Sequence, residues 1–332
     1  MKKYRRWTSL INLIAVAAVY ILLKVVLRMQ GGNRAVESLL VQVFYSIIMA
    51  ASLNLVTGVL GELTLGHAGF MAVGGYTAAI FTTRVFPHHI AFFPAALIVG
   101  GLMAALFGYL VGIPALRLRG DYLAIITLGF GEIIRVLINT VFAPWTGGGK
   151  KMFNIPLYTN VDNAYWIMAL VVALIYMLAF SRHGRAILSI RENEVASESS
   201  GVPVIRYKTE TFVLSAFFAG IAGGLYAHSI GVLDPSKFDF NASINYLVMV
   251  VFGGMGSITG SIASAGVLTV VQFLMAKLVE FRQLAYALLL VGMMIFKPGG
   301  LLGIREFSLH AALARLFPRF YTPAFAQRAP GA

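Results

Sequence analysis

Residues 52–76 read SLNLVTGVLGELTLGHAGFMAVGGY and interrupt a long apolar run with glycine, threonine and histidine. The run resumes at Met71. Irregular backbone at membrane depth is tolerated only where protein or a water-lined cavity satisfies its polar groups. The stretch therefore predicts a broken spanning segment and a candidate wall of a transport pathway. Close packing of helices through small residues is an equally good interpretation of the same glycines.

The composition of the whole chain places it in a membrane. Of its 332 residues, 59% are hydrophobic and 12% are charged, whereas soluble domains average about 25% charged residues. Such a chain has too little polar surface to cover a water-soluble globule. The absence of cysteine also excludes a disulfide framework, a thiolate metal site and a cysteine nucleophile.

A helix that spans a membrane needs about 20 mostly apolar residues. Ten candidate spans follow one another along the chain, at 8–27, 37–60, 68–84, 90–113, 122–142, 164–181, 211–231, 243–256, 262–279 and 284–296. The eighth and the tenth are short. We therefore predict an all-α, polytopic helical membrane protein with about 8–10 transmembrane helices and with broken or re-entrant segments.

The basic residues indicate how the chain is oriented. Lys and Arg outnumber Asp and Glu by 26 to 13, and they gather in a few loops and at both ends. Because short cytoplasmic loops hold an excess of Lys and Arg, we predict that the N-terminus, the 114–121 loop, the 182–210 loop and the tail are cytoplasmic. Only Lys150 and Lys151 go against this rule. The basic start also fits a signal peptide, but no small-residue cleavage site follows the apolar run, which favours a retained anchor helix.

A second glycine-interrupted stretch, FGGMGSITGS at 252–261, lies in the other half of the chain. Interrupted segments in corresponding positions of two halves are typical of a transporter whose site lies at a repeat interface. The residue match between the two stretches is weak, so they suggest an internal repeat and no more.

Residues 116–135 read LRLRGDYLAIITLGFGEIIR and carry charges into a predicted helix. Glu132 and Arg135 are three residues apart and share a helix face. A charge inside a span usually faces the bundle interior or a cavity. Since an arginine is at hand, a structural ion pair is the favoured interpretation of Glu132 over a substrate ligand. The candidate pathway residues of the three stretches are Asn54, Thr57, Gly61, Glu62, Thr64, Gly66, His67, Thr127, Glu132, Gly253, Gly254 and Gly256.

The 182–210 loop is the most distinctive polar segment. Residues 185–199 alternate apolar and charged positions with helical spacing, and Gly201 and then Pro203 stop the helix. Such a helix either lies on the lipid surface or fills a groove in a soluble partner. Lipid-surface helices favour a strongly basic polar face, whereas this one mixes acids with bases. The pattern therefore favours a protein partner.

No motif in the chain indicates chemistry of its own. The TGGGKK run at 146–151 lacks the spacing of a phosphate-binding loop, so we do not expect the chain to bind ATP. The histidines show no ligand spacing, and no nucleophile, base and oxyanion site can be assembled. We predict no catalytic residue, no metal and no cofactor.

These segments together resemble the LivM-type permease subunits of ATP-driven importers for branched-chain amino acids. The family's asparagine-bearing helix and glycine turn resemble residues 54–76, with Thr64 where serine is common and Gly75 where alanine is common. Residues 116–135 match the family's LRLRGDYxAIxTLGFGEIIR run almost position for position.

The resemblance continues through the second half of the chain. Residues 191–201 look like the family's coupling loop RENExAAExxG, with Ser197 where alanine is usual, and 253–257 and 297–303 also fit. The resemblance implies an N-terminal anchor helix and loop at 1–36, a permease domain at 37–305 and a cytoplasmic tail at 306–332.

By resemblance, the chain is not an enzyme and works in a multi-pass complex of the bacterial inner membrane. The complex would hold two such permeases, the second of the LivH type, two cytoplasmic ATPases and a periplasmic binding protein, with no nucleic acid. The basic balance fits loops that face anionic lipid. The residues implied to couple to an ATPase are Arg191, Glu192, Glu194, Ala196, Glu198 and Gly201.

Two alternatives stay open at this stage. Permeases of the same family carry urea, short amides or aromatic acids, and a mostly apolar pathway would suit an amide as well as an apolar amino acid. A chain of a different class, an ion-coupled secondary transporter, would need a titratable group deep in the bundle. Glu62 with His67 is the obvious candidate pair for that role.

Overall fold

The computed structural model describes residues 17–25, 27–28, 33–87, 89–118, 120–275, 287–288, 291–292, 295, 300 and 303. The described residues form helices and connecting turns without a strand, and one isolated antiparallel bridge joins Met152 to Leu233. The all-α class is therefore confirmed. The 306–332 tail lies outside the described residues, as do much of the 8–27 and 284–296 spans and most of the 297–303 motif.

Every predicted span between 37 and 279 coincides with a helix. The long helices are α2 (Arg34–Asn54) with η1 (Leu55–Leu60), α3 (His67–Ile80) with η2 (Phe81–Val85), α4 (Phe93–Ala115), α5 (Asp121–Asn139), α7 (Val161–Ala179), α10 (Val204–Ile230), α11 (Phe240–Gly253) and α12 (Ile258–Leu274). The short ones are η3 (Ile90–Phe92), α6 (Ala143–Thr146), η4 (Gly148–Lys150), α8 (Arg182–Glu192), α9 (Glu194–Ser199) and η5 (Pro235–Phe238).

Length and apolarity indicate which of these helices can cross a membrane. Four described segments are long and apolar enough to cross a membrane: α2 with η1, η3 with α4, α7, and α10. A fifth candidate is a bent pair in which α5 and the α6–η4 segment meet at 73°. Helices α11 and α12 are apolar but shorter. A polytopic membrane protein with bent and broken segments is what the sequence predicts.

The predicted helix at 185–199 is in fact two helices. Its backbone leaves the helical region at Asn193 (φ −158°, ψ 106°), and the side chain of Asn193 accepts a hydrogen bond from the N–H of Ala196 at 3.0 Å. Asparagine competes well for such a capping role. The chain therefore stops α8 and starts α9 where uninterrupted periodicity predicted one element.

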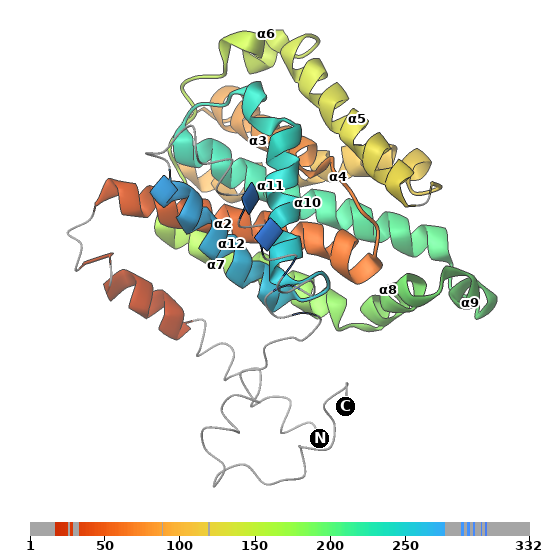
Figure 1. Cartoon of the computed structure of the whole chain (residues 1–332). Helices are drawn as coiled ribbons and strands as arrows, with labels where there is room; N and C mark the ends of the chain where they lie inside the picture. The colour runs from red at the N-terminus through yellow and green to blue at the C-terminus, as the bar shows by residue number, and fades with distance from the viewer. Residues whose placement is uncertain are drawn as a thin grey trace, which may run out of the picture.

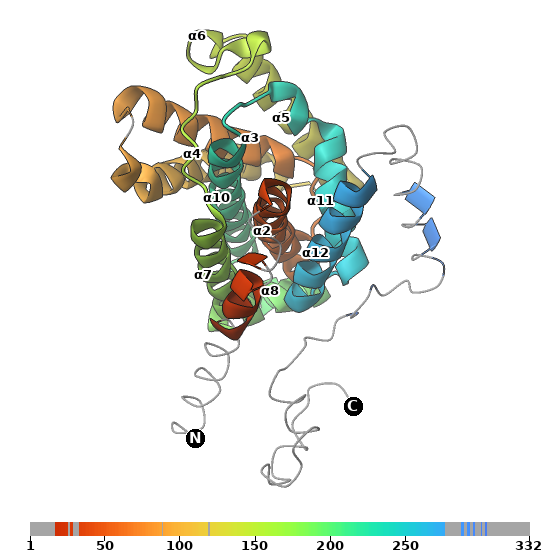
Figure 2. The ribbon, with the colours of Figure 1, turned by 90° about the vertical axis from the view of Figure 1, so that its left-hand side faces the viewer.

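The centre of the bundle is built on small residues. Helix α10 packs against α3 and α4, with Gly220 against Gly74 and Gly223 against Gly75. A Cβ at any of these positions would overlap backbone of the neighbouring helix. Small residues let helix backbones approach closely in membranes, so packing explains these glycines. Figure 2 shows α2 in the middle of the bundle, with α7 and α10 to one side and α11 and α12 to the other.

The two ends of the bundle carry different elements. Helices α8 and α9 lie at one end and α6 at the other (Figures 1 and 2). At the α6 end, Lys151 pairs with Asp234 at 3.0 Å, which neutralises one of the two lysines that break the predicted charge rule. The sequence predicts that the 182–210 loop and the loop with Lys150 and Lys151 lie on opposite sides of the membrane. The positions of these segments at opposite ends of the bundle fit that prediction.

Candidate functional site

The two glycine-interrupted stretches meet, and one side chain joins them. Helix α2 loosens into the π-helix η1 directly after Asn54, which is fully buried. The Nδ2 of Asn54 donates to the carbonyl of Ser257 at 2.9 Å, and its Oδ1 accepts from the N–H of Gly256 at 2.9 Å. Segments about 200 residues apart in sequence are thereby held together by a single amide. We call this contact the junction.

Two distinct features of the junction, close packing and turn geometry, require glycine. A Cβ at Gly58 would overlap both Asn54 and the backbone of Gly256. Gly254 and Gly256 take φ values of +110° and +93°, which L side chains rarely adopt. Close packing and turn geometry therefore account for these positions. Gly253 likewise lies against Gly260.

The turn that follows η1 is anchored to α5. The hydroxyl of Thr127 accepts a hydrogen bond from the N–H of Leu65 at 3.1 Å, and a Cβ at Gly66 would overlap the carbonyl of Thr127. Thr64 and Thr127 are both buried. Leu65 and Gly66 of this turn thus pack directly on Thr127 of α5.

Buried polar groups on either side of the turn have their own partners. The ring Nε2 of His67 lies 2.8 Å from the hydroxyl of Ser52, and the hydroxyl of Thr57 donates to the carbonyl of Leu53 at 3.0 Å. Glu62 does not accompany His67 but pairs with Lys208. The pair on which an ion-coupled transporter would depend is therefore not formed in this structure.

A buried lysine connects the turn to the polar segment. The ammonium of Lys208, in α10, lies 2.7 Å from Glu62 and 3.2 Å from Glu194. The exposed fractions of the three side chains are 4%, 14% and 30% respectively. A lysine is almost never fully buried unless it is paired, and these two carboxylates are the partners that Lys208 has here. Lys208 is not among the site residues predicted from the sequence, because it lies between Arg206 and Glu210 in the predicted 182–210 loop and gives no signal of its own there.

Arginine 191 attaches the same segment to the junction. Its Nη1 donates to the carbonyl of Gly58 at 2.6 Å, and its side chain lies against Gly61 and Gly256. A charged donor makes a stronger hydrogen bond than a neutral one. Helix α8 is therefore fixed to the point at which α2 loosens.

The outer side of α9 has no contact of this kind within the described residues. Ala196 and Glu198 are exposed, Val195 has an exposed fraction of 65%, and Glu192, the last residue of α8, is exposed as well. Gly201 follows with φ +85° and open space around it. Helix α9 thus presents apolar and acidic side chains outward, while Glu194 points inward to Lys208.

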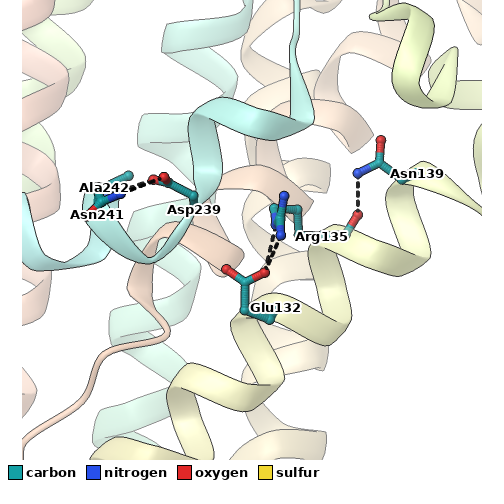
Figure 3. A network of polar contacts seen from close by, with 6 residues as sticks. All are labelled: Glu132, Arg135, Asn139, Asp239, Asn241 and Ala242. Carbon is teal, nitrogen blue, oxygen red and sulfur yellow. Dashed lines mark hydrogen bonds and ion pairs between the residues drawn. The ribbon is translucent and has the colours of Figure 1, made fainter.

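The structure places Glu132 away from this assembly. Its carboxylate pairs with Arg135 of the same helix at 2.6–2.8 Å, and Asn139 donates to the carbonyl of Arg135 (Figure 3). Each member of the pair keeps about a third of its side chain exposed. Asp239, which caps α11, is seen nearby in the same view. The pair shows the geometry of the predicted structural ion pair.

These features define a class of protein. A polytopic helical bundle has interrupted membrane segments that meet at one end, beside an exposed amphipathic segment. Such an architecture fits a membrane permease subunit. A family model, described as the permease component of branched-chain amino acid transport systems, matches residues 35–297. The chain belongs to this family.

Individual relatives agree with the family. The chain is 38% identical over 293 residues to the high-affinity branched-chain amino acid transport permease LivM of Escherichia coli, covering 77% of this chain and 67% of the relative. It is 24% identical over 283 residues to LivH of the same organism, covering 78% and 91%. It is also 27% identical over 278 residues to the L-arabinose transporter permease AraH of Azospirillum brasilense, covering 78% and 77%. No solved structure matches the chain.

Proposed function

We propose that this chain is the permease subunit of an ATP-driven importer that moves branched-chain amino acids across the bacterial inner membrane. The observation that supports this most directly is the α8–α9 segment. It exposes Val195 and Glu198 outward while Arg191 and Glu194 tie it to the interrupted spans. A segment built this way can receive a push from a soluble partner and pass it to the membrane part of the chain.

The partner that fits α9 is an ATPase. An amphipathic helix binds by laying its apolar side in a groove, and here Val195 is flanked by exposed acids. The chain carries no phosphate-binding loop of its own, so ATP hydrolysis belongs to the partner and this chain is not itself an enzyme. Residues 37–305 would form the permease domain, in line with the extent of the family match.

The remaining subunits follow from the relatives. Similarity to both LivM and LivH supports a pair of related permeases, of which this chain resembles LivM more strongly. A periplasmic binding protein would deliver the substrate to the α6 end. The α8–α9 end would then face the cytoplasm, as the basic loops at that end favour.

The substrate assignment rests on the names of the relatives. LivM and LivH are named for branched-chain amino acids, whereas AraH is named for L-arabinose, so related permeases serve chemically different cargo. Uptake of radiolabelled L-leucine, competed with isoleucine, with an amide and with arabinose, measures the preference. Competition by isoleucine alone supports the proposal, and competition by an amide or arabinose alone contradicts it.

A charge reversal on α9 tests the docking role. We expect Glu198→Lys to reduce the ATPase subunits that co-purify from native membranes in mild detergent at least tenfold, because reversed charge at an interface costs several kcal/mol. Lys237→Glu reverses an exposed charge at the opposite end and is the matched control. If both variants retain the ATPases and transport, α9 is not the docking element.

A further inference from the structure

We propose that Arg191 and Lys208 are positioning residues that tie the ATPase-docking segment to the interrupted spans, and that Glu194 is the separable part of this tie. The inference rests on the proposed function, because it takes α9 as the element that partner ATPases bind. It goes further by assigning the contacts through which movement of α9 reaches the membrane segments.

Arg191 makes the fixed contact. It lies in the last turn of α8, and its bond to the carbonyl of Gly58 is short at 2.6 Å. Its aliphatic part packs on Gly61 and its guanidinium lies beside Gly256. One side chain therefore touches both interrupted stretches where Asn54 clamps them together. Any displacement of α8 acts directly on that junction.

Helix α9 is attached differently. Asn193 breaks the chain between α8 and α9 with an extended backbone, so the two helices are separate rigid pieces. After this break, Glu194 is the first residue of α9, and its carboxylate reaches Lys208 of α10. Thus α8 is held by Arg191, while the start of α9 is held by an ion pair.

The two arms of the Lys208 contact are unequal. The Glu62 arm is shorter, at 2.7 Å against 3.2 Å, and Glu62 is half as exposed as Glu194. Ion pairs that water can reach cost little to open. If α9 moves away, Lys208 keeps Glu62 and no buried charge is left unpaired. If the turn carrying Glu62 moved instead, the ammonium would lose its shorter contact at a higher cost. The Glu194 arm is therefore the one that opens.

Because the Glu194 contact opens more easily than the Glu62 contact, the tie can be released and formed again. With Glu194 bound to Lys208, the start of α9 is held against α10, and the junction is held by Arg191. With Glu194 released, α9 is free to follow its partner about Asn193. Loss of the Glu194 arm should leave folding and docking intact but weaken the link between ATP hydrolysis and movement of substrate.

The test compares two neutralised carboxylates in the assembled importer. Glu194→Gln removes the separable arm, and Glu37→Gln removes the same charge from an exposed carboxylate in the first turn of α2, outside the docking segment. Complexes with the co-purified partner subunits are placed in vesicles, and L-leucine moved per ATP hydrolysed is measured. We expect Glu194→Gln to lower this ratio at least fivefold, the lower end of typical coupling between sites. Glu37→Gln should match the unmodified protein, and Glu194→Asp should restore part of the ratio.

Each other outcome is decisive. A normal ratio in Glu194→Gln, or an equal fall in Glu37→Gln, overturns the assignment of Glu194. Loss of co-purifying ATPases in Glu194→Gln makes this residue a docking contact and also overturns it, as does failure of that variant to fold. If the unmodified chain brings down no ATPase, the proposed function fails instead.

Discussion

Single residues decide how this chain keeps charge and polarity inside a bundle. Lys208 is buried because two carboxylates meet it, and Asn54 is buried because its amide has a donor and an acceptor opposite. Buried polar groups are retained where they are paired, since an unpaired one costs the full loss of hydration. The sequence suggested that Asn54 and Glu62 matter. It could not supply their partners, because those lie about 150 to 200 residues away and pairing depends on the fold.

At the α6 end, Asp234 should make the free energy of unfolding depend on pH. Hydrogen bonds from Ser236, with help from Lys151, lower the pKa of Asp234 from 3.8 to about 2. A lowered pKa in the folded state stabilises the protein above the unfolded pKa, and the contribution is lost as pH falls towards 2. We expect Asp234→Asn to cost about 1 kcal/mol at pH 7.

The difference between Asp234→Asn and the unmodified protein should be constant above about pH 5 and shrink below pH 4. Unfolding followed by tryptophan fluorescence in detergent measures it. Glu37→Gln, which neutralises an exposed carboxylate in the first turn of α2, is a control without this pH dependence. A difference that grows on acidification would contradict the role of Asp234.

The helices were the most predictable part of the molecule. Apolar runs of about 20 residues gave each described span from α2 to α12, because apolarity is a property of the segment itself. Breaks within helices were less predictable. The glycine stretch correctly predicted an interruption after Asn54, but the cap at Asn193 was missed, since a single asparagine within amphipathic spacing is a weak signal. Helix α10 begins at Val204, whereas the apolar run predicted a start at 211. Its first turns are polar and so do not belong to the apolar run, but contacts with α8 and α9 support them as helix.

Gly58 is the residue of η1 that comes closest to Gly256, and its position should tolerate no side chain. We expect Gly58→Ala to destabilise the protein by about 1–3 kcal/mol, because its Cβ would displace Asn54 and the backbone of Gly256. Gly129→Ala is the control: a helical position with open space should gain up to about 1 kcal/mol from alanine's helix propensity. Thermal unfolding in detergent compares the two. If Gly58→Ala were as stable as Gly129→Ala, the junction would not be tightly packed.

At the scale of the whole molecule, the junction lies at the end that carries α8 and α9. The pathway candidates Asn54, Glu62 and Gly256 therefore gather beside the α8–α9 segment. Sequence alone listed these residues as candidates but could not say that they share one place. It also could not show which face of the bundle would meet a second permease, because that depends on contacts between two chains.

The orientation of the whole molecule can be tested because the chain contains no cysteine. Ser189 is exposed on α8, and Gly149 is exposed on η4 at the opposite end, with open space for a side chain. If the α8–α9 end faces the cytoplasm, a membrane-impermeant maleimide should label Gly149→Cys in right-side-out vesicles and Ser189→Cys only in inverted ones. The unmodified chain, which has no thiol, is the blank. The reverse pattern would place α9 outside, where no ATPase could dock, and would overturn both the orientation and the coupling role argued for Arg191, Glu194 and Lys208.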